Sequence, residues 1–172
     1  MINNTKTRDI VVAALTHATP YIRMYKNKVF VIKAGGEVFE DIETTKTLVE
    51  QIAILHQIGI RVVIVHGGGP QSTRLADTLG IETNMVEGRR VTDAKTLKVS
   101  AMVLNGEINT QILAACRSLS VPAVGISGVD CGLIKASKRP PVKIDDETVD
   151  YGFVGNIDSV DISAVSYTHL TL

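Results

Sequence analysis

The stretch RVVIVHGGGPQ, residues 61–71, decides the fold of this chain. Its first half, RVVIV, is rich in β-branched residues, the pattern of a strand buried on both faces of a parallel sheet. The run ends in three consecutive glycines, Gly67–Gly69. Pro70 then suits the first turn of a helix, because its missing N–H is not needed there. We therefore expect a strand, a glycine turn and a helix in succession, the repeating unit of an α/β protein.

The same alternation continues on both sides of this stretch. Residues 28–34 form another apolar run, which ends in Gly35 and Gly36, and residues 43–58 have the periodicity of an amphipathic helix. Residues 121–126, VPAVGI, predict a third buried strand. The pattern indicates an α/β fold, a three-layer α/β/α sandwich with a mainly parallel sheet. Because such sheets usually have about five or more strands, we expect this one to be incomplete at the C-terminus.

A long helix is expected over residues 94–118, with Asp93 as its N-terminal cap. Asn105 and Gly106 interrupt it, and a glycine inside a helix implies a close approach of its backbone to the sheet or to a ligand. The spacing predicts that the buried face consists of Leu97, Ala101, Leu104, Ile108 and Ile112. Residues 84–91 are predicted to be extended, and the segment after Ser127 predicts hairpins or short strands.

The two terminal segments differ from the rest. Residues 6–25 predict an N-terminal helical extension, within residues 1–25, that Pro20 should kink or break near its end. Residues 166–172 follow no helix cap and complete no element, so we interpret them as a non-native tail on a truncated chain.

Composition excludes several classes of function. The chain has 172 residues, 45% of them apolar, which suits one ordinary domain. Its 18 basic and 18 acidic residues balance, so no bulk field attracts nucleic acid or an anionic membrane. No apolar run approaches the ~20 residues of a membrane span, and the N-terminus lacks a signal peptide's pattern. Cys116 and Cys131 fit neither a zinc motif nor a disulfide framework, so we expect reduced cysteines and a cytoplasmic protein.

Both apolar runs at 28–34 and 61–65 lead into glycines. In an open α/β sheet ligands bind beyond the carboxyl ends of the strands, and neighbouring parallel strands would bring both turns to one edge. Their backbone N–H groups, together with the start of the following helix, favour an anion such as phosphate. The alternative interpretation is that both glycine stretches are tight turns without a binding role. Because glycines end two successive strands, this alternative is the weaker one. Neither turn is a Walker P-loop or a GxGxxG motif.

Few side chains near these turns could carry chemistry. Lys33 lies two residues before Gly35, where a buried ammonium would be costly unless it met an anion, so it is the best candidate for charge neutralisation in phosphoryl transfer. A lysine that extends to solvent from the strand end is the alternative. Of Arg89 and Arg90, only one should face the site, because consecutive residues of an extended segment point oppositely. We interpret His66 as structural.

Other chemistries have little support. Asp130 could hold a cation, but a turn cap is the better interpretation. The sequence contains no HExxH motif, no Cys/His metal set and no nucleophile elbow, so we expect no metal ligands from the protein and no covalent hydrolysis.

In their order and spacing, the segments KAGG, VVIVHGGGPQ, GRRVTDAKTLKVSAMVLNGEIN and PAVGISGVDCGLI resemble the N-acetylglutamate kinases of the amino-acid kinase superfamily. The resemblance implies phosphorylation of the side-chain carboxylate of N-acetyl-L-glutamate by ATP with Mg²⁺, the second step of arginine biosynthesis. It further implies that residues 26–165 are the N-terminal, acetylglutamate-binding part of the kinase domain. Two positions depart from the family pattern, which often has Tyr or Leu at Ala34 and Lys at Val129.

The resemblance also implies roles for single residues. Lys33 would be catalytic and stabilise the transferring phosphoryl group. Gly35, Gly36 and Gly69 would bind phosphate, Gly68 and Gly69 would contact acetylglutamate, and Arg90 would bind its α-carboxylate. The family's nucleotide-binding half follows these segments, so we expect this chain alone to be inactive.

Three further expectations come from the same resemblance. The N-terminal helix is similar to the one that interlaces dimers in arginine-sensitive hexamers, so a homo-oligomer is implied, either a dimer or a hexamer. A helix that packs on its own domain is the alternative. Two other functions stay open: the arginine-sensing domain of an acetylglutamate synthase, and a kinase for N-acetyl-aminoadipate.

Overall fold

The computed structural model describes residues 5–145 and 147–163 of the chain, so the predicted tail at 166–172 lies outside the described residues. The α-helices are α1 (Thr5–Tyr25), α2 (Ile42–Gln57), α3 (Gly69–Thr78), α4 (Ala94–Ala101) and α5 (Asn109–Ser118). Two 3-10 helices, η1 (Gly36–Phe39) and η3 (Asp130–Gly132), and the π-helix η2 (Met102–Ile108) join them. The strands are β1 (Val29–Ala34), β2 (Arg61–His66), β3 (Asn84–Val86), β4 (Arg89–Val91), β5 (Ile134–Lys138), β6 (Val142–Ile144), β7 (Glu147–Val149) and β8 (Gly155–Val160).

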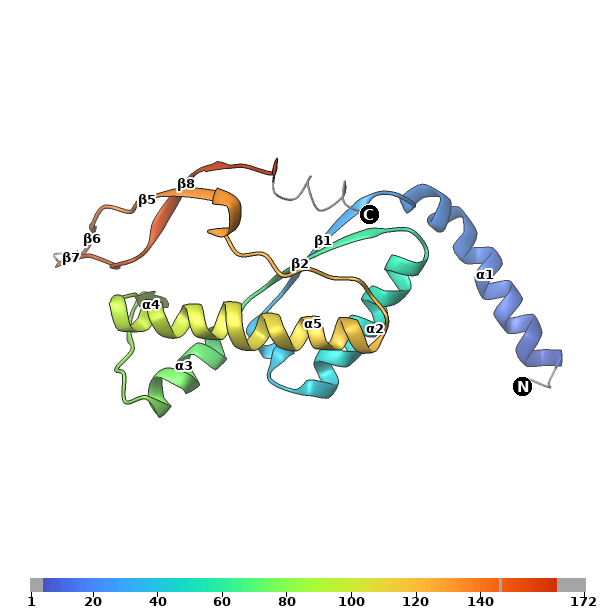
Figure 1. The fold of residues 1–172 in the computed structure, drawn as a ribbon, viewed down its shortest axis with the longest axis horizontal. Helices are drawn as coiled ribbons and strands as arrows, with labels where there is room; N and C mark the ends of the chain where they lie inside the picture. Colours follow the sequence, from blue (N-terminus) through green and yellow to red (C-terminus); the bar gives the residue numbers. More distant parts are fainter. Residues whose placement is uncertain (1–4, 146, 164–172) are drawn as a thin grey trace.

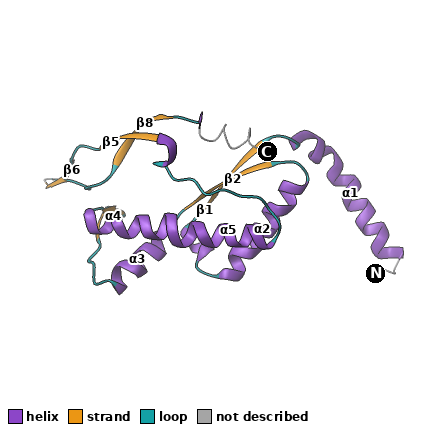
Figure 2. Ribbon diagram, viewed as in Figure 1, coloured by secondary structure: helices purple, strands orange, loops and turns teal. Residues whose placement is uncertain are grey.

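A parallel pair of strands is the centre of the fold. β1 and β2 align residue by residue, from Val29 opposite Arg61 to Ala34 opposite His66. α2 contacts both β2 and α5, and Figure 2 shows α2 and the long helix on one side of this pair. The predicted α/β class and the parallel pairing of these strands are therefore confirmed. The later hairpins are also as predicted, since β5 pairs with β8 and β6 with β7, all antiparallel.

The prediction that β1 and β2 are buried on both faces is wrong for the described residues. Exposure alternates along both strands, with Val31 68% exposed and Val63 44% exposed on one face. The opposite face packs against the helices, where Ile64 contacts the hydrophobic core and Ala34 is part of it. The branched residues marked the strands correctly, but they did not show which of their faces is covered.

The predicted third strand at residues 121–126 does not form within the described residues. β1 and β2 pair only with each other there, and a strand requires a hydrogen-bonded neighbour to satisfy its backbone groups. Val121 is buried at the end of α5, but Val124 is 71% exposed. Although this segment is apolar, its backbone is irregular. It passes close to the end of β2, since Gly125 and His66 line the same cavity.

α1 stands apart from the rest of the described chain (Figure 1). It is not broken at Pro20 and continues to Tyr25, so the expected break is wrong. Because proline has no N–H, one carbonyl of the preceding helical turn lacks its hydrogen-bond donor. This carbonyl faces water on an exposed helix, so the helix tolerates the loss. Ile10 and Leu15 are 68% and 60% exposed, so α1 does not pack on its own domain as the alternative interpretation required.

The predicted long helix exists, but a π-helical segment divides it. α4 begins after Asp93, whose carboxylate accepts a hydrogen bond from the N–H of Thr96 at 2.7 Å, as the cap prediction requires. Seven residues, Met102–Ile108, are π-helical and contain Asn105 and Gly106. π-bulges occur mostly at functional sites, so the interruption points to the neighbourhood of this segment.

The predicted buried face of this helix is confirmed at Ile108 and Ile112 and wrong at Leu97, and the π-helix explains the difference. Leu97 is 41% exposed, whereas Val103 and Ile108 are completely buried. The buried positions are Val99, Val103, Ile108, Ile112 and Cys116, four apart except for one step of five inside the π-helix. A pattern based on uninterrupted α-helical spacing misses this extra residue.

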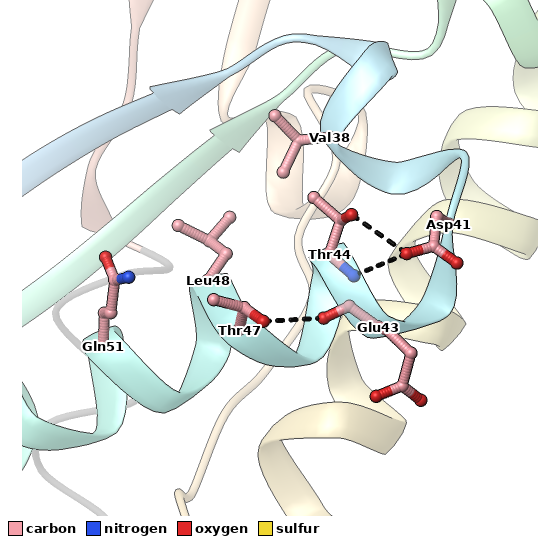
Figure 3. Close-up of a pocket in the computed structure, with 7 residues that line it drawn as sticks. All are labelled: Val38, Asp41, Glu43, Thr44, Thr47, Leu48 and Gln51. Carbon is pink, nitrogen blue, oxygen red and sulfur yellow. Dashed lines mark hydrogen bonds between the residues drawn. The ribbon is translucent and has the colours of Figure 1, made fainter.

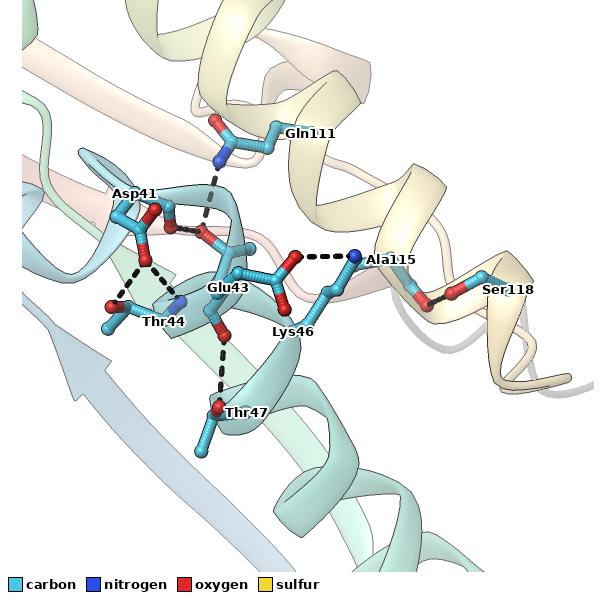
Figure 4. A network of polar contacts seen from close by, with 9 residues as sticks. Asp41, Glu43, Thr44, Lys46, Thr47, Gln111, Ala115 and Ser118 are labelled. Atoms are coloured by element: carbon cyan, nitrogen blue, oxygen red, sulfur yellow. Dashed lines mark hydrogen bonds and ion pairs between the residues drawn. The ribbon is translucent and has the colours of Figure 1, made fainter.

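The long helix also makes a polar contact with α2. Thr45 is completely buried, and its hydroxyl accepts a hydrogen bond from Gln111 Nε2 at 3.0 Å. Figure 4 shows Gln111 reaching from α5 toward the start of α2, where the Asp41 carboxylate accepts from Thr44. Burial raises the pKa of the Cys116 thiol in the adjoining core, whereas Cys131 is exposed.

Ile108→Ala should lower the free energy of unfolding by about 2–5 kcal/mol, because it leaves a cavity in the core. Leu97→Ala is the matched control on the same helix and should cost about 0.5 kcal/mol, as exposed substitutions do. Urea unfolding of the two variants measures both values. If both variants lost the same free energy of unfolding, the buried face predicted from regular α-helical spacing would be correct after all.

Candidate functional site

The two glycine turns meet at the carboxyl ends of β1 and β2, as the parallel pairing predicted. The N–H of Gly67 donates to the carbonyl of Ala34 at 2.9 Å and holds the turns together. A Cβ on Gly67 would lie 3.3 Å from the nitrogen of Gly36. A Cβ on Gly36 would lie 3.1 Å from the Cα of Gly68. The backbones of the two turns are therefore in direct contact.

None of the three glycines of the triplet has the left-handed backbone conformation. The reason for glycine at these positions is therefore the space that a side chain would need. Gly67 faces the first turn, and Gly68 faces the π-helix, where a Cβ would lie 2.6 Å from Ile108 Cδ1 and 2.8 Å from Leu104 Cδ2. Around Gly69, by contrast, no described atom lies within 4 Å of an added Cβ. The first two glycines allow close packing, and the third leaves open space at the start of a helix.

Two helix N-termini converge at this edge. η1 begins at Gly36 after Gly35, and α3 begins at Gly69 after Gly68, neither with a side-chain cap. The first N–H groups of a helix have no partner within the helix. Exposed N–H groups at helix starts favour anions, and Pro70 removes just one of them. The arrangement suits a phosphate or carboxylate group.

Arg90 reaches this edge from the β3–β4 hairpin. The hairpin turns at Glu87 and Gly88, both with positive φ (47° and 71°), the conformation that tight hairpins need. Arg90 Nη2 lies 2.6 Å from Thr73 Oγ1 and 3.5 Å from the carbonyl of Gly69. Arg89 is exposed, so only one of the two arginines faces the start of α3, as expected.

Lys33 lies next to the glycine turns but is not buried. It is the fifth residue of β1 and lies on the exposed face of that strand, together with Val31. The desolvation argument used to select it is therefore wrong for the described residues. Its position at the strand end, one residue before Ala34 and the Gly35–Gly36 turn, does place it at the edge where the glycines meet.

A cavity of about 270 Å³ lies beside His66, the residue before the triplet. Its lining includes His66, Asn105 and Asp130, and so joins the end of β2, the π-helix and the loop after residue 121. The imidazole of His66 stacks edge-on against Phe39, with 6.0 Å between ring centroids. The Asp130 carboxylate accepts from the N–H and hydroxyl of Ser127 at 2.6 and 2.9 Å, which lowers its pKa. Asp130 is thus a turn cap, the preferred interpretation.

A shallower hollow of about 380 Å³ lies between η1 and α2 (Figure 3). Its principal polar atoms belong to the α2 cap, since Asp41 Oδ2 accepts from Thr44 N and Oγ1 at 2.8 and 2.9 Å. Those bonds lower the pKa of Asp41. Among the described residues, no group of three or more His, Cys, Asp or Glu side chains could hold a metal ion. No helix among them could span a membrane.

Gln71 and Thr73 of α3 were not predicted from the sequence. Gln71 is 3% exposed, and its Nε2 donates to the carbonyl of Gly36 at 2.7 Å. Thr73 positions the guanidinium of Arg90. Both residues follow the glycine triplet within a few positions of the sequence. That closeness to the triplet is the one sequence feature that could have indicated them.

The family model described as "Amino acid kinase family" matches residues 28–168. This chain belongs to the amino acid kinase family. The match covers β1, both glycine turns, the hairpin that carries Arg90 and the long helix. The geometry described above is thus that of an amino acid kinase chain.

Two curated relatives of this amino acid kinase chain carry the same name. It is 45% identical to "Acetylglutamate kinase" of Myxococcus xanthus (strain DK1622), covering 90% of this chain and 52% of that protein. The acetylglutamate kinase of Novosphingobium aromaticivorans is 41% identical, with 88% and 53% covered. The chain spans about half the length of the curated relatives it matches.

Solved structures give a second name. N-acetylglutamate synthase from Neisseria gonorrhoeae, complexed with coenzyme A and N-acetyl-glutamate, superposes with a TM-score of 0.71 at 32% identity, covering 91% of this chain and 34% of that one. The same protein with coenzyme A and L-arginine gives a TM-score of 0.69 at 30% identity, with 91% and 36% covered. Both names concern acetylglutamate.

Gly69→Ala should leave the free energy of unfolding within about 0.5 kcal/mol, because its Cβ meets open space. The N–H of residue 69 is retained, but the added methyl group would fill the open space beside it that a phosphate oxygen would use. It should therefore weaken the binding of inorganic phosphate about tenfold, because a hydrogen bond to a charged group contributes about 1.5–3 kcal/mol. NMR titration of the 172-residue chain with phosphate, together with urea unfolding, measures both effects.

Gly68→Ala is the control for this experiment. Its Cβ would press on the buried Ile108 side chain, so it should cost about 1–3 kcal/mol of stability through overpacking. If Gly69→Ala binds phosphate as well as the original chain does, the triplet is a packing device and no binding site.

Proposed function

We propose that the protein to which this chain belongs transfers the γ-phosphoryl group of ATP to the side-chain carboxylate of N-acetyl-L-glutamate, in arginine biosynthesis. The main support is the junction at one sheet edge of two glycine turns, Arg90 and Lys33. The names of the curated relatives supply the substrate. Within this proposal, residues 26–165 form the acetylglutamate-binding part.

The substrate would lie over the start of α3. Arg90 would exchange its contact with Thr73 for the α-carboxylate, whose two oxygens match the guanidinium fork. The N–H groups of Gly68 and Gly69 would donate to the acetylglutamate and hold its side-chain carboxylate near the first glycine turn. This orientation would bring the reacting oxygen to the edge where Lys33 extends.

Phosphoryl transfer requires positioning and charge neutralisation. A carboxylate oxygen forms a bond to the γ-phosphorus while the bond to the β-phosphate oxygen breaks, which gives an acyl phosphate and ADP. Gly35, Gly36 and Gly69 would donate backbone hydrogen bonds to phosphate oxygens. The ammonium of Lys33, exposed on β1, would neutralise the charge that the transferring group spreads over its oxygens.

ATP with Mg²⁺ is the cofactor within this proposal. The N–H groups of the two turns would fit phosphate oxygens, with Gly35 and Gly69 exposed and Gly36 buried. Mg²⁺ is commonly bound through phosphates and water with few protein ligands. The described residues include no protein cluster for that ion. ATP would supply the phosphoryl group that is transferred. We propose the cytoplasm as the compartment, where cysteines such as Cys116 and Cys131 stay reduced.

A second candidate function is an arginine-sensing domain of an acetylglutamate synthase. The similarity to the synthase structures, one of them bound to L-arginine, favours it. A synthase also has an acetyltransferase activity, so acetyl transfer from acetyl-CoA to glutamate distinguishes it from a kinase. A kinase for N-acetyl-aminoadipate is the third candidate, and only the acceptor acid distinguishes it from the first.

The longest open reading frame that contains this chain should consume ATP with acetylglutamate and much less with acetyl-aminoadipate. Lys33→Ala should lower kcat about 10²–10³-fold, the effect of removing one group that stabilises transition-state charge. A coupled assay for ADP measures both, and the 172-residue chain by itself should give negligible turnover. Unchanged kcat in Lys33→Ala would contradict the catalytic role.

We also propose that α1 joins copies of this chain into a homo-oligomer, either a dimer or a hexamer in which α1 interlaces dimers. Its apolar residues are exposed, including Val12 at 55% and Met24 at 60%, and it stands apart from the sheet (Figure 1). Exposed apolar surface of this kind favours association.

Deletion of residues 1–20 should reduce the mass of the full reading frame's assembly, as measured by light scattering. Leu79→Ser, a change at an exposed leucine outside α1, is the control and should leave the mass unaltered. An unchanged assembly after the deletion would end the proposal that α1 interlaces copies.

A further inference from the structure

Gln71 is the polar side chain that the proposed function leaves unexplained. It is the third residue of α3 and only 3% exposed, although glutamine is rarely so deeply buried. Its Nε2 donates to the carbonyl of Gly36, a residue 35 positions earlier in the chain, at 2.7 Å. Its Oε1 is a buried side-chain oxygen without a hydrogen-bond partner among the described residues.

The surroundings of Gly36 are fitted to this side chain. A Cβ on Gly36 would lie 2.8 Å from Gln71 Oε1 and 2.8 Å from Pro70 Cδ. The glutamine amide therefore lies flat against the Gly36 backbone, with the start of α3 beside it. Gly36 is buried, so its carbonyl depends on Gln71 for the donor that solvent would otherwise provide.

The choice of an amide at position 71 has an energetic cost. A buried acceptor without a partner is unfavourable, and a methionine of the same length would remove that acceptor. The benefit lies in the other half of the amide. Glycine is the most flexible residue, so turns made of glycines bring backbones close together but do not hold them in one geometry. A hydrogen bond from a packed helix to the Gly36 carbonyl supplies that constraint.

We infer that Gln71 is a positioning residue that locks the first glycine turn against the second, so that their N–H groups are preorganised for a phosphate oxygen. This rests on the proposed function, because it assumes that an anion binds between the turns. Gln71 does not touch the ligand. It acts through Gly36, whose backbone direction it fixes, and preorganised donors bind charge better than mobile ones.

Gln71→Met tests this role, with Gln111→Met as the matched control. Gln111 also bridges two elements, α5 and α2, through its Nε2, at 3.0 Å from Thr45 Oγ1. Because Thr45 Oγ1 in turn donates to the carbonyl of Val38 at 3.5 Å, Gly67 is the amide on which the two variants are compared. Both variants are prepared in the 172-residue chain. Amide hydrogen exchange is followed at Gly67, whose N–H bonds to the Ala34 carbonyl between the two turns, and at Val38, whose N–H bonds to the Gly35 carbonyl within the first turn.

In Gln71→Met, exchange at Gly67 and Val38 should be at least about tenfold faster, an opening free energy lowered by about 1.4 kcal/mol. Amides of α2 and the urea midpoint should not change, because one unsatisfied buried acceptor replaces another. The affinity for inorganic phosphate, measured from the Gly36 and Gly69 amide shifts, should fall about tenfold. Gln111→Met should leave both the Gly67 amide and the phosphate affinity unaltered.

The outcomes separate the possible failures. Unchanged exchange in Gln71→Met overturns the lock, whatever the affinity does. Faster exchange with unchanged phosphate affinity also overturns the inference, because Gln71 would then be merely structural. If the original chain does not bind phosphate at any concentration tested, the anion site between these turns fails and this inference is overturned. The proposed function is tested separately, by the ADP assay on the full reading frame.

Discussion

The contact between two glycine backbones is the constraint on which the rest of the structure depends. Parallel pairing with Ala34 opposite His66 ends both strands at the same level, so that Gly67 must pass directly beside Gly36. A side chain on Gly36 would press on Gln71 and Pro70 of α3, and one on Gly67 would crowd the nitrogen of Gly36. The approach therefore sets how closely the start of α3 can lie to the first turn.

Much of this arrangement could be predicted from the sequence, because it is local. Branched apolar runs that end in glycines specify β1 and β2, and Asp93 specifies the start of α4. The meeting of the turns at one edge follows from parallel pairing, which the alternation of strands and helices indicates. The alternation of an extended segment predicted that only one of Arg89 and Arg90 would face the site, and the family resemblance pointed to Arg90. The hairpin has that geometry.

What could not be predicted depends on partners distant in the chain. The burial of a strand face and the pairing of residues 121–126 depend on neighbours that a local pattern does not contain. The exposure of Lys33 has the same cause. Gln71 was missed because a glutamine on a short helix usually faces solvent, and only the packed turn shows where its amide points.

The π-helix gives the long helix one residue more than its packing needs. With that residue removed, the buried positions would follow each other at intervals of four throughout, and α4 and α5 would read as one regular helix. The surplus residue lies where Leu104 and Ile108 form the wall behind Gly68. Alignments of related chains that assume constant helical spacing would therefore be displaced by one position on one side of this wall, and a gap placed there would be structurally meaningful.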